Sequence, residues 1–88
     1  MKRTKDYVIK TVIDGNKVER SVILIIDDDK KEGSVYVELK GQHKGKYVKA
    51  IEFTEKDNAI DLPEAVFQAV KMEDETLAGL LYEKRDIE

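Results

Sequence analysis

The residues best suited to bind a ligand lie in the stretch 40–49. This stretch contains a histidine, a tyrosine and four lysines but no acidic residue, the lysines being Lys40, Lys44, Lys46 and Lys49. Lysine ammonium groups neutralise phosphates, and aromatic rings stack on unpaired bases. A sheet edge with both kinds of side chain can hold a single-stranded nucleic acid without reading its sequence.

Three residues outside this stretch extend the same surface if their strands are neighbours. These are Tyr36, Lys10 and Arg20. A purely structural alternative stays open, because lysines on exposed strands block edge-to-edge association and tyrosines cover cores.

Residues for catalysis or metal binding are scarce. The chain has one histidine, His43, no cysteine, and no glycine-rich loop between a strand and a helix. A hydrolytic triad, a histidine or thiolate metal site and a phosphate cradle therefore each lack a component. The run 27–29 of three aspartates lacks the alternating spacing and central glycine of a calcium loop, which favours a solvated turn. We expect a non-enzymatic protein without a cofactor or a bound metal.

The charge distribution suggests a second kind of function. Residues 1–53 carry 12 Lys+Arg against 9 Asp+Glu, whereas residues 54–88 carry 4 against 10. The first part is therefore mildly basic and the second part acidic. The alternative hypothesis is a protein-interaction module or small inhibitor that meets a basic partner through its acidic helical face.

The length and composition indicate a single domain, 1–88, of 10.1 kDa. The absence of cysteine, of a long apolar run after the basic residues 1–5, and of any stretch of about 18 apolar residues predicts a cytoplasmic protein that does not contact a membrane.

Residues 6–60 read as an antiparallel sheet that follows a basic tail, 1–5. β-Branched residues and apolar alternation predict strands at 7–13, 18–26, 34–40 and 46–53, with a short strand end at 59–60. The run 14–17, Asp-Gly-Asn-Lys, is a strong hairpin signal, because Gly and Asn accept the positive φ that tight turns need. In 46–53, Tyr47 and Lys49 share their alternation with inward-facing Ile51 and Phe53, which predicts a β-bulge or a strong twist.

Residues 61–85 read as helical. Asp61 can cap the first helix in a capping box with Glu64, and Pro63 is tolerated in the first turn. Leucines at helical spacing after residue 73 predict a second helix or a continuation of the first. The sequence therefore predicts an α+β fold, a strongly twisted antiparallel sheet of four to five strands followed by one or two C-terminal helices.

This order of elements resembles a known family. Twisted strands, a short last strand and the run 59–64, Ala-Ile-Asp-Leu-Pro-Glu, lead into an amphipathic helix with Phe67 and Val70. The chain is similar in this respect to the positive cofactor four family of single-stranded-DNA-binding transcriptional coactivators. The Whirly and Pur-alpha families share the same ββββα plan.

The resemblance implies a homodimer formed largely through helix packing, whose curved sheets present a basic, aromatic groove to single-stranded DNA or RNA. It casts the four lysines of 40–49 as phosphate contacts, and Tyr36 and Tyr47 as stacking platforms. The expected dimer interface consists of Val66, Phe67, Val70, Leu77, Leu80 and Leu81. The expected function is that of a small dimeric regulator of transcription or replication.

Overall fold

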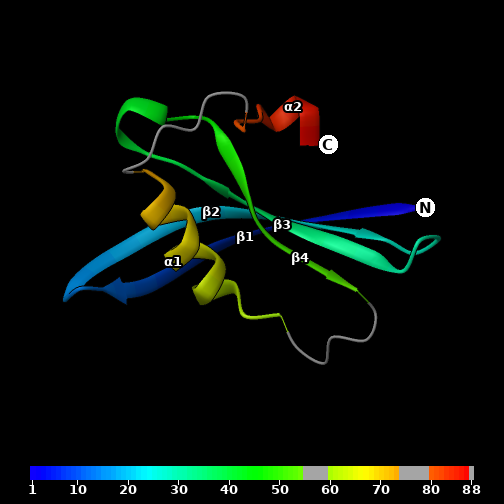
Figure 1. Ribbon diagram of the computed structural model, residues 1–88, viewed down its shortest axis with the longest axis horizontal. Helices are drawn as coiled ribbons and strands as arrows, with labels where there is room; N and C mark the ends of the chain where they lie inside the picture. Colours follow the sequence, from blue (N-terminus) through cyan, green and yellow to red (C-terminus); the bar gives the residue numbers. More distant parts are fainter. Residues whose placement is uncertain (55–59, 74–79, 88) are drawn as a thin grey trace.

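A computed structural model describes residues 1–54, 60–73 and 80–87. Within these ranges the chain forms one antiparallel sheet in the order β1-β2-β3-β4, with helix α1 across one face (Figure 1). The elements are β1 (Lys2–Ile13), β2 (Asn16–Asp27), β3 (Glu32–Glu38), β4 (Tyr47–Thr54), α1 (Leu62–Glu73) and the short α2 (Lys84–Ile87). This arrangement confirms the α+β fold with ββββα order.

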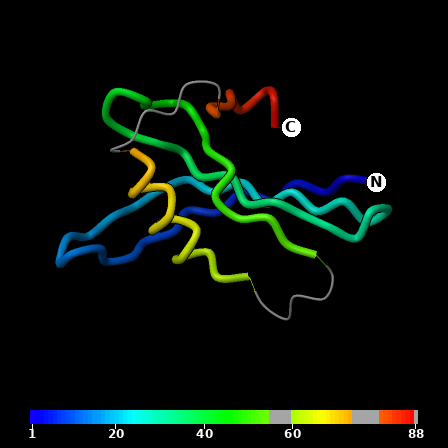
Figure 2. The backbone as a smooth tube through the Cα atoms, viewed as in Figure 1, coloured from blue at the N-terminus to red at the C-terminus, as the bar shows by residue number. Residues whose placement is uncertain are grey.

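Strands β1 and β2 form a long hairpin whose turn lies at the opposite end of the molecule from the two termini (Figure 2). Ile13 pairs with Asn16 across a two-residue turn. Asp14 and Gly15 both have positive φ, 52° and 80°, as the tight turn with the right twist for a hairpin requires.

Strand β1 starts at Lys2, so the residues predicted as a basic tail, 1–5, are largely part of the sheet. Their polar sequence hid this, because an edge strand can be exposed on both faces. The Arg3 guanidinium donates two hydrogen bonds of 3.0 Å to Asp28, which ties the start of β1 to the β2–β3 turn. The aspartate run forms that turn, and the Asp27 carboxylate accepts the N–H groups of Asp29 and Lys30 at 3.1 and 3.2 Å.

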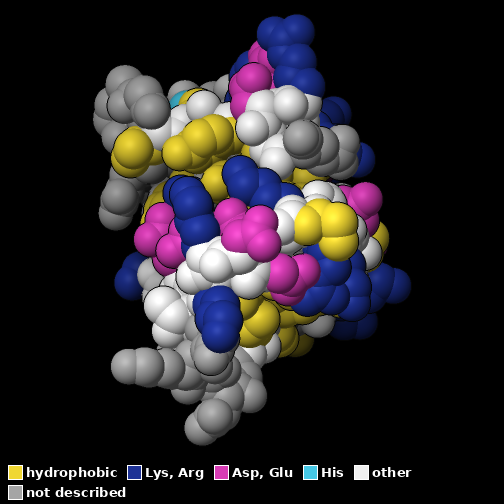
Figure 3. Space-filling view, turned by 90° about the vertical axis from the view of Figure 1, so that its right-hand side faces the viewer, with side chains coloured by type: hydrophobic (Ala, Val, Ile, Leu, Met, Phe, Trp, Pro, Cys, Tyr) yellow, Lys and Arg dark blue, Asp and Glu magenta, His cyan; other side chains and the backbone are white. Residues whose placement is uncertain are grey.

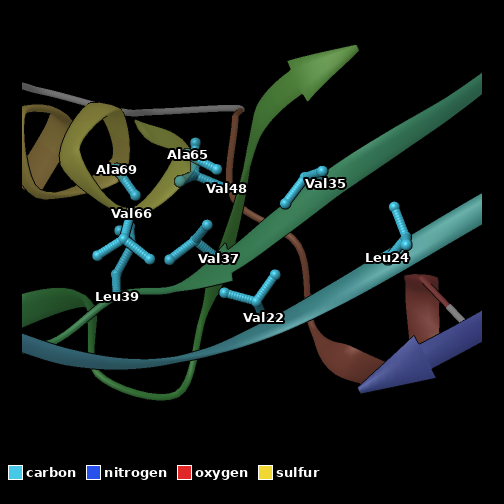
Figure 4. Packing of buried hydrophobic residues seen from close by; sticks show 9 residues of the cluster. All are labelled: Val22, Leu24, Val35, Val37, Leu39, Val48, Ala65, Val66 and Ala69. Atoms are coloured by element: carbon cyan, nitrogen blue, oxygen red, sulfur yellow. The ribbon is translucent and has the colours of Figure 1, made fainter. Parts of the chain in front are cut away.

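The hydrophobic core lies between the sheet and α1. Alternate residues of β3 and its extension, Val35, Val37 and Leu39, are fully buried on the helix side, as the alternation predicted. Figure 4 shows Val66 and Ala69 of α1 pointing toward these side chains. The helix meets the sheet mainly through Val66 and small alanines, which allow close approach.

Asp61 caps α1 as predicted. Its carboxylate accepts the N–H of Glu64 at 3.0 Å, and its carbonyl accepts the N–H of Ala65 at 3.1 Å. The reciprocal half of the predicted capping box is different, because the Glu64 carboxylate accepts a bond from Gln68 instead.

The predicted β-bulge is present in β4. Val35 pairs with Ile51 but Tyr36 pairs with Lys49, which leaves Ala50 as the extra residue. The bulge turns Lys49 away from the face that carries Ile51.

The predicted helical region, 61–85, is helical only in part among the described residues: α1 and α2 are present, but residues 80–83, where the second helix was expected, are not helical. Tyr82 forms an antiparallel bridge with Tyr47 through two backbone hydrogen bonds of 2.8 and 2.9 Å. The open edge of β4 offers backbone partners that compete with helix formation. Ile60 is not part of a strand, and the rest of that predicted strand end lies outside the described residues. No helix in the described ranges is long and apolar enough to cross a membrane.

Candidate nucleic-acid interface

The sheet face turned away from α1, here called the outer face, carries part of the predicted site. Tyr36 of β3 and Lys49 of β4 are paired across adjacent strands, and Tyr47 pairs with Glu38 on the same face. The Lys49 ammonium lies 5.7 Å from the centre of the Tyr36 ring, a cation–π distance. The structure therefore brings Tyr36, Tyr47 and Lys49 to one face.

A carboxylate already neutralises Lys49. The Lys49 Nζ lies 3.0 Å from the Glu52 carboxylate. This hydrogen bond is the main reason that the pKa of Lys49 is raised. The ammonium is thus fixed beside the Tyr36 ring, and a phosphate would have to compete with Glu52 for it.

Tyr47 cannot be the predicted stacking platform. It is only 5 % exposed, and Tyr82 pairs with its backbone. The Tyr82 ring instead meets Tyr36 edge to face, with centroids 5.3 Å apart and planes at 83°. The accessible aromatic surface of the outer face is therefore the half-buried pair Tyr36 and Tyr82.

The connection between β3 and β4 presents the other predicted lysines. A 3-10 turn at Gly41–His43 and positive φ angles at Gly41 and Gly45 shape this connection. Lys40 and Lys44 are exposed, and their ammonium groups form no ion pair with any described residue. They are the predicted phosphate contacts that remain most available.

Lys46 is already paired within the chain. Its ammonium donates to Glu83 at 2.7 Å, and this bond is the first cause of the lowered pKa of Glu83. The ion pair holds segment 80–87 against the end of β4.

Arg20 has a different role from the predicted one. It lies on the helix side of the sheet, where its guanidinium donates to both oxygens of Glu73 at 3.1 and 3.2 Å. The two side chains are only 11 % and 17 % exposed. Arg20 thus fastens β2 to the end of α1 and does not face a groove. Sequence periodicity did not reveal this, because the alternation of β2 becomes continuous apolar sequence just after Arg20.

Lys10 lies apart from the other predicted residues. It is exposed on β1, opposite Glu19 of β2 and nearer the hairpin turn than Tyr36. By the alternation of β1 its side chain is on the outer face, but β1 is the edge strand opposite to β4. The eight predicted residues are therefore not assembled into one groove.

A hollow of about 230 Å³ opens on the outer face beside Tyr36 and Lys49. Its lining includes the cations Lys2 and Lys30 as well as the carboxylates of Asp27, Glu32 and Asp86. Figure 3 shows basic and acidic side chains interspersed at this end of the molecule. The charge of the hollow is therefore mixed.

The expected dimer interface on the helix is largely internal. Val66 is fully buried in the core, and Val70 and Leu81 pack against the same cluster, which contradicts the use of Val66 as an interface residue. Phe67 is half-buried under the ammonium of Lys71. Leu80 is 57 % exposed, and Leu77 lies outside the described residues.

Sequence reasoning missed Tyr82 and Glu83, which help to hold segment 80–87 on the sheet. The adjacent bulky residues Leu81 and Tyr82, which point to opposite sides, were the available signal for an extended segment.

The fold and site together define a small α+β domain with a tyrosine- and lysine-bearing sheet face. Comparisons with protein-family models, curated proteins and solved structures give no match.

Proposed function

We propose that the protein is a non-enzymatic, single-stranded nucleic-acid-binding protein, a small homodimeric cytoplasmic regulator of transcription or replication. The observation that supports this is the placement of Tyr36 and Lys49 side by side on the outer face. Lys40 and Lys44, which form no ion pair with a described residue, lie at one end of the same two strands. This surface combines a π-face with cations, as sequence-independent strand binding requires.

The binding track follows β3 toward the β3–β4 connection. One base stacks on the Tyr36 and Tyr82 pair, and the phosphates that follow meet Lys49, Lys46 and then the two exposed lysines. Lys40 follows Tyr36 by four positions, which is about 13 Å at the rise of an extended chain. This length accommodates a few phosphates.

Binding is expected to be weak and dependent on salt. For single strands the logarithmic salt slope is about −0.7 for each neutralised phosphate. If only Lys40 and Lys44 contribute, the slope is about −1.4, and affinity falls about sevenfold between 50 and 200 mM salt. If Lys46 and Lys49 also exchange their carboxylates for phosphates, the slope approaches about −2.8 and the loss about fiftyfold.

The alternative function through an acidic helical face has less support. Glu73 and Glu83 are already bonded to Arg20 and Lys46 within the chain. Two of the five acidic residues in the described ranges 60–73 and 80–87 are therefore neutralised within the chain.

Fluorescence anisotropy with a labelled single-stranded oligonucleotide at several salt concentrations tests the proposal. The variant Lys40→Ala/Lys44→Ala is expected to bind more weakly at low salt and to have a slope smaller by about 1.4. Lys71→Ala, which removes one cation from α1 on the other side of the sheet, is the matched control. An absence of binding at low salt, or an equal loss in the Lys71→Ala control, would contradict the proposal.

A further inference from the structure

Strand β1 leaves one long edge of the sheet open. It is 12 residues long, and among the described strands it pairs only with β2. At the other edge, β4 is partly covered by the bridge between Tyr47 and Tyr82. Among the described residues, no backbone hydrogen bond reaches the free side of β1. Such an edge is a template for another strand.

The hydrogen-bond pattern shows which residues of β1 face that open side. Ile13 and Asn16 flank a two-residue turn, and Met1 accepts the N–H of Asp28 at 3.2 Å. Odd-numbered residues of β1 therefore direct their N–H and C=O groups toward β2. The even-numbered residues, from Lys2 to Val12, direct theirs outward.

The side chains of these even-numbered residues form an unusual pattern for an exposed edge. Val8 and Val12 are 60 % and 63 % exposed. Asp6 and Lys10 flank Val8 at equal distances in sequence, and neither forms an ion pair with a described residue. A lysine at an edge usually blocks association, but here Asp6, on the other side of Val8, supplies the opposite charge that a second copy would place beside Lys10.

We propose that this edge binds β1 of a second copy of the chain, antiparallel, with Val8 opposite Val8 on the two-fold axis. In this register Asp6 of each copy lies opposite Lys10 of the other. Thr4 lies opposite Val12. Each even-numbered residue faces another even-numbered residue, so about ten outward backbone hydrogen bonds form.

Charge selects this register among those that the backbone allows. An axis at Asp6 places two aspartates opposite each other, and an axis at Lys10 places two lysines opposite each other, both of which are unfavourable. Axes at Tyr7 or Ile9 leave both charges opposite uncharged residues. An axis at Thr4 would pair Lys2 with Asp6, but it aligns only residues 2–6 and sets Arg3 opposite Lys5. Of the axes from Asp6 to Lys10, only the one at Val8 forms two opposite-charge pairs.

The helix-side residues of β1 agree with the same register. Tyr7 then lies opposite Ile9 of the second copy, and Lys5 opposite Thr11, so no like charges meet. Because the pattern complements itself under a two-fold rotation, a second copy fits this edge better than an unrelated peptide does. The inference goes beyond the proposed nucleic-acid binding and does not depend on it.

Light scattering coupled to size-exclusion chromatography over a range of concentrations tests this dimer. The wild-type chain is expected to reach twice its 10.1 kDa. Asp6→Lys and Lys10→Asp each create two like-charge pairs, and each is expected to raise the dissociation constant about 10- to 100-fold. The double variant Asp6→Lys/Lys10→Asp restores opposite pairs and is expected to restore the dimer.

Controls separate the interface from the fold. Circular dichroism checks that each variant stays folded, and Lys71→Asp reverses a charge on α1, which lies on the other face of the sheet from Asp6 and Lys10. A monomer at all concentrations, an unchanged dimer in Asp6→Lys, or a double variant as weak as the single ones would overturn the proposal. Binding of an unrelated extended peptide to a monomeric chain would also overturn it.

Discussion

The ion pair between Arg20 and Glu73 makes the sharpest prediction about stability. The Glu73 oxygens accept three hydrogen bonds from the Arg20 guanidinium, at 3.1–3.2 Å, and one of 3.0 Å from the N–H of Lys40. This single carboxylate therefore joins β2, the end of β3 and the end of α1.

Replacing Glu73 by alanine leaves a mostly buried guanidinium without its counter-charge. Removing one partner of a fully buried pair costs about 3–5 kcal/mol. Because both side chains keep some exposure, 11 % and 17 %, we expect a loss of about 2–4 kcal/mol. That is a large share of the roughly 4–13 kcal/mol expected for a domain of this size.

Urea denaturation followed by circular dichroism measures this change. With a slope of about 1 kcal/mol per molar urea, the midpoint is expected to fall by about 2–4 M. Glu64→Ala, an exposed change on the same helix, is the control and should cost less than about 1 kcal/mol. Arg20→Met/Glu73→Leu, which removes both charges, should recover most of the loss.

Equal destabilisation by Glu73→Ala and Glu64→Ala would refute the reasoning. A double variant that is less stable than Glu73→Ala would also refute it, because the cost is assigned to the uncompensated arginine.

Two further predictions concern the β3 packing and segment 80–87. A Cβ at Gly33 would lie 2.3 Å from Cζ of Phe53 and 2.6 Å from the Ile25 carbonyl oxygen. Gly33→Ala is therefore expected to destabilise the fold by about 1–3 kcal/mol. Thermal unfolding measures this loss, and an unchanged midpoint would contradict the prediction. The pKa of Glu83 is lowered, chiefly by its hydrogen bond with Lys46. The ionised carboxylate therefore stabilises the docking of segment 80–87 fully at pH values above the ordinary carboxyl pKa, 4.5. We expect the docking to weaken as the pH falls through the lower pKa that Glu83 has in the folded chain. Amide exchange of this segment against pH measures the effect, and Glu83→Gln should remove this pH dependence; a wild-type profile identical to that of the variant would contradict it.

The parts of the fold that followed from sequence are those governed by local chemistry. Asp14-Gly15 specifies its turn through positive φ, Asp61 specifies the start of α1 through its cap, and the alternation of β3 specifies its buried face. The bulge in β4 was also predictable, because Tyr47 and Phe53 could not both keep their expected faces in a regular strand.

The parts that sequence missed depend on contacts between distant segments. Residues 80–83 have helical leucine spacing, but the open edge of β4 and the ring of Tyr36 lie within reach only after the sheet has formed. Arg20 looks like any exposed cation until α1 brings Glu73 beside it. The start of β1 was hidden because its polar residues pair with the long β2 without facing the core.

These contacts also explain the charge asymmetry of the chain. The basic first part and the acidic second part are joined by Arg20 with Glu73 and by Lys46 with Glu83. These opposite charges therefore stabilise the docking of the C-terminal elements on the sheet, and the paired groups are less available to an external ligand. Of the four lysines in 40–49, only Lys40 and Lys44 form no ion pair with a described residue, so the cationic surface available to a ligand is smaller than the sequence suggests. On the open edge of β1, Asp6 and Lys10 form no ion pair of this kind with any described residue.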